Sequence, residues 1–419
     1  MRRRLRTIGI GAVLIIASST GSLGANGRSH LLAAACRPLA RLALDEVVDP
    51  PASVSADGRY VAFESRADLV PSDVNGGSDI YVLDRVIGRL TLESIAFDGG
   101  AANGDSAHPR LSGDGRWLVF ESRATNLARE SLGQKVDVFL RDRVAGTTRG
   151  LTPSLPASNG SSRSADAVIS QDGRVVAFAS NDRWIVDGVG PHDAGDDIYV
   201  LTVATGAIVR ASVTSSGVRP AIGSSFAPSL DADGTVVAFT STADLERGGA
   251  AFEWSQIFVR DLTHGTTRLV SASPDGRPAN RVSHTATISG DGRFVAFVST
   301  ASNLGSRDDN HLSHIYLRDL QTGAINLVSR TPHGKAANGH SSRPAISANG
   351  QFVAFVSEAS DLACDRRCSP NRRWAALIRI RRTYASGSSA RRTRRQEWHA
   401  EASAACARSS ASHRSPVRA

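Results

Sequence analysis

The sequence predicts an all-β protein that is assembled from six copies of one unit. Three features support this fold class. The stretch SADGRYVAFES at residues 55–65 returns five more times, at Ser112, Ser170, Asp231, Ser289 and Ser347. The copies are evenly spaced, and each of the first five is followed by a second run of strand-forming residues. No helical hydrophobic period occurs among these units.

The spacing of the copies is best measured from the acidic or amide residue before their glycine. Successive markers are 57, 58, 61, 58 and 58 residues apart, and they are Asp57, Asp114, Asp172, Asp233, Asp291 and Asn349. A period of this length is typical of a repeated supersecondary unit. We therefore divide residues 40–362 into a repeat domain, with units near 51–108, 109–166, 167–227, 228–286, 287–344 and 345–380.

Each unit is expected to open with a β-hairpin. An Asp-Gly pair between two apolar runs favours a tight turn, because glycine adopts positive φ without a Cβ clash. The second strand of the hairpin is apolar at four consecutive positions, as in Tyr60–Phe63 and Val175–Phe178. Such a strand is buried on both faces. We assign these residues to packing.

A third and a fourth strand follow in the first five units. The third begins about 22 to 25 residues after each glycine, at Ile80, Val138, Ile198, Ile257 and Ile315. Four short strands per unit predict the blades of a six-bladed β-propeller, in which neighbouring blades cover one another. The sixth blade is predicted to be incomplete. The segment Leu42–Leu44 resembles a last strand that could pair into it and close the ring.

The pattern S-x-D-G-R-x-V-A-F-x-S followed by I-Y-V-x-D resembles the WD-like propeller repeat of TolB-like proteins. The resemblance covers residues 51–362. It implies a six-bladed propeller, an extracytoplasmic location and a role in protein–protein contact, without implying one activity. TolB itself resembles an α/β domain joined to a propeller. Only about 25 residues separate the leader from the first repeat here, which leaves no room for that domain.

The N-terminus indicates export. Basic residues at Arg2–Arg6 precede the apolar run Ile8–Ala17 and small residues up to Ala25, which is the order found in a secretory signal. We predict a signal peptide at residues 1–25 and a secreted or periplasmic product without a transmembrane segment after cleavage. The alternatives are an uncleaved anchor and a lipoprotein attached at Cys36.

One loop carries a candidate metal site. Asp73, Asn75 and Asp79 space oxygen ligands two and six residues apart around a glycine, as calcium prefers. The other units do not repeat this set, so one calcium in the first blade is the hypothesis. The alternative is that the acids cap a turn. No other cofactor is expected.

The function predicted from these features is that of an exported, non-enzymatic binding or scaffold module. We predict no catalytic residues, because hydrolase and metalloprotease motifs are missing from the sequence. The expected partner is a protein or a cell-wall component, and the chain is expected to be a monomer. The rival function is a glycan hydrolase or lyase with its site in the axial funnel. Inward carboxylates with raised pKa values would favour that rival.

The C-terminal segment departs from the repeats. Residues 364–419 hold 14 Arg and three acids, whereas the whole chain carries a net charge of +9. The repeat domain is therefore mildly acidic, and the basic pI is no evidence for specific nucleic-acid binding. We expect this Arg-, Ala- and Ser-rich tail to be disordered. The alternative is a frameshifted reading of the gene that leaves a degenerate propeller without function.

Overall fold

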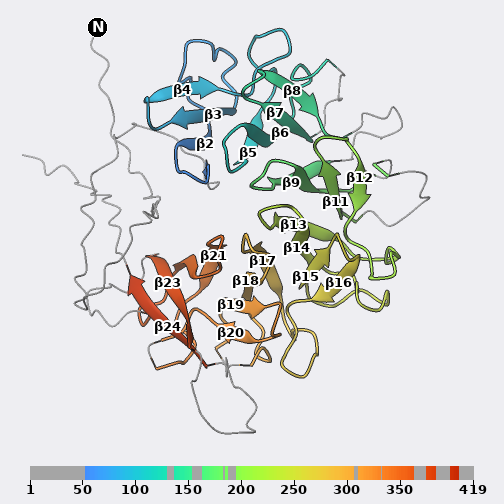
Figure 1. Ribbon diagram of the computed structural model, residues 1–419, viewed down its shortest axis with the longest axis vertical. Coiled ribbons are helices and arrows are strands. Elements are labelled where there is room, and N and C mark those ends of the chain that lie inside the picture. Colours follow the sequence, from blue (N-terminus) through green and yellow to red (C-terminus); the bar gives the residue numbers. More distant parts are fainter. Residues whose placement is uncertain are drawn as a thin grey trace, which may run out of the picture.

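The chain forms six β-sheets that follow one another around a common centre (Figure 1). The computed structural model describes residues 52–129, 136–152, 163–182, 185–186, 195–305, 310–331 and 333–362, and the backbone of 374–383 and 397–404. No helix occurs within these ranges, so none there could span a membrane. The predicted signal peptide, Cys36 and the segment Leu42–Leu44 lie outside the described residues.

Each sheet contains four antiparallel strands in chain order. The first three sheets are formed by β1 (Ser53–Val54), β2 (Tyr60–Ser65), β3 (Asp79–Asp84) and β4 (Arg89–Leu92); β5 (Ser106–Leu111), β6 (Trp117–Ser122), β7 (Asp137–Asp142) and β8 (Thr147–Gly150); and β9 (Ser164–Ile169), β10 (Val175–Ser180), β11 (Asp197–Thr202) and β12 (Ile208–Arg210). The fourth and fifth are formed by β13 (Ser225–Leu230), β14 (Val236–Ser241), β15 (Gln256–Asp261) and β16 (Thr266–Leu269); and β17 (Ser283–Ile288), β18 (Phe294–Ser299), β19 (His314–Asp319) and β20 (Ile325–Leu327).

The sixth sheet departs from the repeat halfway through. Its first two strands, β21 (Ser341–Ile346) and β22 (Phe352–Ser357), match the other units. Its last two, β23 (Trp374–Thr383) and β24 (Glu397–Ala404), come from the basic tail and are longer than their counterparts. The regular repeat therefore ends after β22, as the prediction of an incomplete sixth blade implies, and the two further strands of this sheet come from the tail. The rest of the tail lies outside the described residues.

The Asp-Gly hairpins form as predicted. In the first sheet Gly58 has a φ of 72°, and the Ser55 hydroxyl donates to Asp57 (2.6 Å) while it accepts from the Tyr60 amide (2.9 Å). The same serine-to-turn bonds recur at Ser112, Ser170, Ser289 and Ser347. These bonds explain why the repeat begins with serine and an acid, because the two side chains satisfy the backbone of the turn.

The second strands are buried between neighbouring sheets, as the apolar runs predict. Val176, Ala177 and Phe178 have no exposed surface. Phe178 packs with residues of the second sheet, and Ala177 packs with residues of the fourth. A backbone hydrogen bond also joins each sheet to the next, as from Ala56 to Gly113 (2.8 Å) and from Gly113 to Gln171 (2.7 Å). Each sheet thus shields the flanks of its neighbours.

Candidate functional site

The three residues of the predicted calcium site lie together in the first sheet, in the loop before β3 and at the start of that strand. Asp73 and Asp79 are buried, and the hydroxyl of Tyr81 donates to Asp73. The Ser94 hydroxyl donates to Oδ1 of Asp79 (2.6 Å). Burial raises the pKa of Asp79, and the nearby Asp73 and Asp105 carboxylates add to that rise, although the hydrogen bond from Ser94 opposes it.

The Asn75 side chain, predicted to be a calcium ligand, forms hydrogen bonds with the backbone. Its side-chain oxygen accepts the Gly77 amide (2.7 Å), and its Nδ2 donates to the carbonyl of Ala102 (2.8 Å). Asn75 therefore braces the loop against the next segment of chain. Over the described ranges there is no group of three or more His, Cys, Asp or Glu side chains placed to hold a metal ion.

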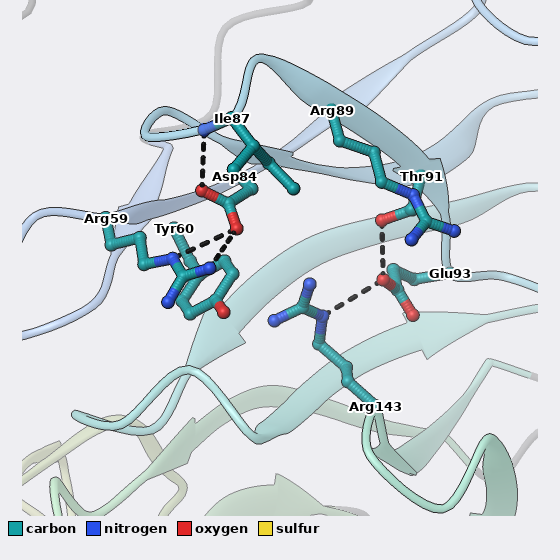
Figure 2. Close-up of a pocket in the computed structure, with 8 residues that line it drawn as sticks. All are labelled: Arg59, Tyr60, Asp84, Ile87, Arg89, Thr91, Glu93 and Arg143. Carbon is teal, nitrogen blue, oxygen red and sulfur yellow. Dashed lines mark hydrogen bonds and ion pairs between the residues drawn. The ribbon is translucent and has the colours of Figure 1, made fainter.

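A second candidate is a pocket of about 330 Å³ where the first sheet meets the second. Figure 2 shows the side chains that line it. Most belong to the first sheet, where they come from the β1–β2 hairpin, the end of β3, the β3–β4 turn, and β4 with the residue just after it. One arginine extends into the pocket from the second sheet. The lining residues are Arg59, Tyr60, Asp84, Ile87, Arg89, Thr91, Glu93 and Arg143. The sequence did not reveal this set, because its members lie up to 84 positions apart.

Both acids of the pocket are neutralised by arginines. Nε and Nη2 of Arg59 donate to Oδ2 of Asp84 at 3.0 and 2.7 Å, and this contact lowers the pKa of Asp84. Glu93 is buried and accepts from Nε of Arg141 (3.1 Å) and Nε of Arg143 (3.0 Å). A carboxylate held this way is a poor general acid.

The remaining groups of the pocket are cationic, aromatic or aliphatic, except for Thr91, whose hydroxyl donates to Glu93 (2.8 Å). The Tyr60 ring contacts the guanidinium groups of Arg59 and Arg143, at 4.9 and 4.7 Å from the ring centre. Arg89 is exposed and forms no ion pair with any residue that the structure describes. The net positive charge favours a ligand that carries a carboxylate or another anion.

In three of the sheets, the arginine of the first hairpin forms an ion pair with the acid at the end of the third strand. Arg116 pairs with Asp142 and Arg293 pairs with Asp319, both at 2.7 Å, as Arg59 does with Asp84. Asp319 pairs with this hairpin arginine and not with its neighbour Arg318, because adjacent residues on a strand point to opposite faces.

Aliphatic side chains are exposed on the turns beside the pocket. Val86 and Ile87, in the β3–β4 turn, are 72% and 63% exposed, and Val144, in the β7–β8 turn, is 78% exposed. The corresponding turn of the fifth sheet carries Gln321 and Thr322 instead. Apolar residues on this rim are thus concentrated at the first two sheets.

The inner strands carry a repeated distortion. β5, β9, β13, β17 and β21 lie on the side of each sheet that faces the centre (Figure 1). Each pairs with its neighbour through a register shift. At the shift one residue adopts positive φ, and these residues are His108, Asp166, Ala227, Thr285 and Arg343. A bulge of this kind redirects side chains and is frequent near functional sites.

Three carboxylates gather along these inner strands. Glu64 accepts the amide of His108 (3.0 Å), Glu121 accepts the amide of Asp166 (2.7 Å), and Asp166 accepts the amide of Ala227 (3.1 Å). The His108 ring also contacts Glu121 at 3.1 Å, which raises the pKa of His108. Burial raises the pKa of Asp166. Each acid therefore accepts a hydrogen bond from the backbone amide of the positive-φ residue in the next sheet.

Solved structures of two TolB proteins are similar to this chain. The chain is similar to TolB from Acinetobacter baumannii at 17% identity over 78% of this chain, with a TM-score of 0.42, and it spans 62% of that protein. It is similar to a TolB from Agrobacterium tumefaciens at 19% identity over 66% of this chain and 78% of the other, with a TM-score of 0.39. No family model and no curated protein matches the sequence.

The propeller domain of a protease is also among the similar solved structures. The propeller of the Trilobed protease from Pyrococcus furiosus is similar at 14% identity over 78% of each chain, with a TM-score of 0.48. The repeated four-stranded antiparallel sheets around a common centre are those of a β-propeller. This architecture by itself does not imply one activity.

Proposed function

We propose that the protein is an exported, non-enzymatic binding module that contacts a protein partner through the pocket between the first and second sheets. The observation that carries this proposal is the combination of an arginine-lined pocket with exposed aliphatic side chains on the adjoining turns. Exposed apolar residues beside convergent polar groups are typical of interaction sites. The basic N-terminal leader supports an extracytoplasmic location.

The chemistry of the pocket favours binding over catalysis. Asp84 and Glu93 are both held by arginines, so neither is suited to exchange a proton with a substrate. Arg89 and the Tyr60 ring can receive a ligand carboxylate and an apolar side chain respectively. The partner that fits best is a protein segment with an acidic residue flanked by apolar residues.

Affinity capture from the native cell envelope tests this function. The full mature chain should retain one protein reproducibly, and a variant carrying Val86→Asp and Ile87→Asp should lose most of it. Arg89→Glu should weaken capture as well, because it reverses the charge that receives the ligand. The matched control carries Gln321→Asp and Thr322→Asp in the equivalent turn of the fifth sheet and should bind like the unaltered chain.

Two results would count against the proposal. One is capture that is equal for the pocket variant and the control. The other is capture of envelope polysaccharide in place of a protein, with the same loss in the pocket variant, which would retain the site and change the class of partner.

A second candidate function is turnover of a glycan at the inner strands. The specific observation in its favour is Asp166, whose pKa is raised by burial, close to the His108–Glu121 pair. Release of reducing sugar from envelope glycans by the unaltered chain, abolished by Asp166→Asn, would support it. Absence of turnover in the unaltered chain would leave the binding function as the better account.

A further inference from the structure

One side-chain position is used alike in the first five sheets. It is the first residue of the third strand, and in each sheet it contacts a serine or threonine hydroxyl just after the fourth strand, at 2.6 to 3.1 Å. The five residues are Asp79, Asp137, Asp197, Gln256 and His314. One polar atom of this residue therefore forms a hydrogen bond within its own sheet.

The other polar atom of this residue also has a protein partner in three of the sheets. Oδ2 of Asp197 contacts Nε of Arg219 at 2.7 Å and Nε of Arg210 at 3.4 Å. In the fourth sheet the carboxylate is replaced by Gln256, whose Nε2 donates to the Ala279 carbonyl (2.9 Å). In the fifth, Nε2 of His314 contacts Asn310 (3.0 Å).

In the first sheet, no described protein group contacts the corresponding oxygen of Asp79. Oδ2 of Asp79, Oδ1 of Asp73 and Oγ of Ser78 are all buried, and none has a hydrogen-bond partner within the described residues. The three residues are 0, 4 and 6% exposed. Burying an unpaired carboxylate oxygen is costly, and two of them in one loop repel each other.

We propose that a calcium ion binds Asp73, Ser78 and Asp79 in the first sheet. Carboxylate and hydroxyl oxygens are ligands that this hard cation accepts, and its charge would compensate both acids. The ion takes the place that Arg219 occupies in the third sheet. Ser78 is the ligand that the sequence did not indicate, and Asn75 is a positioning residue, because both ends of its amide are bonded to the backbone.

Calorimetry on the full chain, after treatment with chelator, tests the site. Titration with calcium chloride should show one site, with a Kd on the order of 10⁻⁴ to 10⁻³ M, the range of extracellular calcium modules. Calcium should raise the melting temperature. Asp79→Asn should weaken binding about tenfold or more and abolish that rise, since two charged ligands become one. Without calcium it should melt at or above the unaltered chain, because the amide removes the buried charge.

The matched control is Asp197→Asn, at the same position in the third sheet, which should leave calcium binding unchanged. If Asp79→Asn fails to fold, Ser78→Ala should still bind calcium several-fold more weakly. The proposal is overturned if the unaltered chain gives neither binding heat nor a shift in melting temperature with calcium. It is also overturned if Asp79→Asn and Ser78→Ala both respond to calcium as the unaltered chain does.

Discussion

Two glycines show how closely neighbouring sheets approach each other. Gly173 has a φ of 73°, and a Cβ built on it would lie 2.5 Å from Cδ1 of Trp117 in the preceding sheet. Gly234 has the same relation to Val175, also at 2.5 Å. The positive φ could be predicted from the Asp-Gly turn. The close contact could not, because it depends on the angle between two sheets.

Gly173→Ala should therefore destabilise the protein more than Gly58→Ala. Both substitutions force positive φ on a residue with a Cβ, at a cost of about 1–2 kcal/mol. At Gly58 the nearest atom is the mobile Nη1 of Arg85, at 3.6 Å, so little more is added. At Gly173 overpacking against Trp117 should add roughly 1–3 kcal/mol. Chemical denaturation of both variants measures the difference, and equal losses would refute the close packing of the second and third sheets.

Strands differ in how far the sequence determines them. The Val-Ala-Phe strands were predictable because four apolar residues in a row fit a strand covered on both faces. The inner strands were harder to predict. SAHPRL, SADAVI and SHTATI share a serine, a Pro or Ala at the fourth position and a final Leu or Ile, but the third residue, which adopts positive φ, differs in each. The bulge becomes evident only when Glu64 and Glu121 are seen to hold the turned amides.

The His108–Glu121 contact between β5 and β6 predicts a pH effect. The pKa of His108 is raised because Glu121 bonds to its ring, so the pair stabilises the fold fully below the unfolded pKa, about 6.5. That stabilisation is lost as the pH rises through the higher folded pKa. NMR titration should give His108 a pKa above its ordinary value, and Glu121→Gln should lower it.

His284, near the start of β17, provides the internal control for that titration. Burial lowers its pKa, and Glu121→Gln should leave it unchanged. A titration in which His108 behaves as an unpaired histidine in the unaltered chain would show that the contact does not form in solution.

The six described sheets form a series in which each sheet covers the flank of the next, and the first and sixth sheets are the two ends of that series. Phe294, Ala296 and Val298 of the fifth sheet are at most 1% exposed, since they pack on the sixth. Their counterparts in the sixth sheet are only partly buried, and they are Phe352, Ala354 and Val356. The cluster around Phe63 and Tyr81 contains residues of the first sheet alone. Among the described residues, no backbone hydrogen bond joins the first and sixth sheets.

The sequence predicted this series of sheets well and the candidate sites in part. Repetition made the sheets evident, because six similar units must bury their flanks on one another. Asp73 and Asp79 could be proposed as metal ligands from the sequence because they lie close together in the chain. The pocket could not be predicted, because Arg143 reaches it from another sheet. Ser78 could not be predicted either, because a lone serine carries no signal before its burial is known.

Hydrogen–deuterium exchange across the second strands tests most directly whether each sheet is stabilised by the flanks of its neighbours. Sheets covered on both sides should open least, so amides of β10 and β14 should exchange at least about tenfold more slowly than those of β2 and β22, a difference of ~1.4 kcal/mol. Equal protection of all four strands, or slower exchange in β2 and β22, would contradict the account.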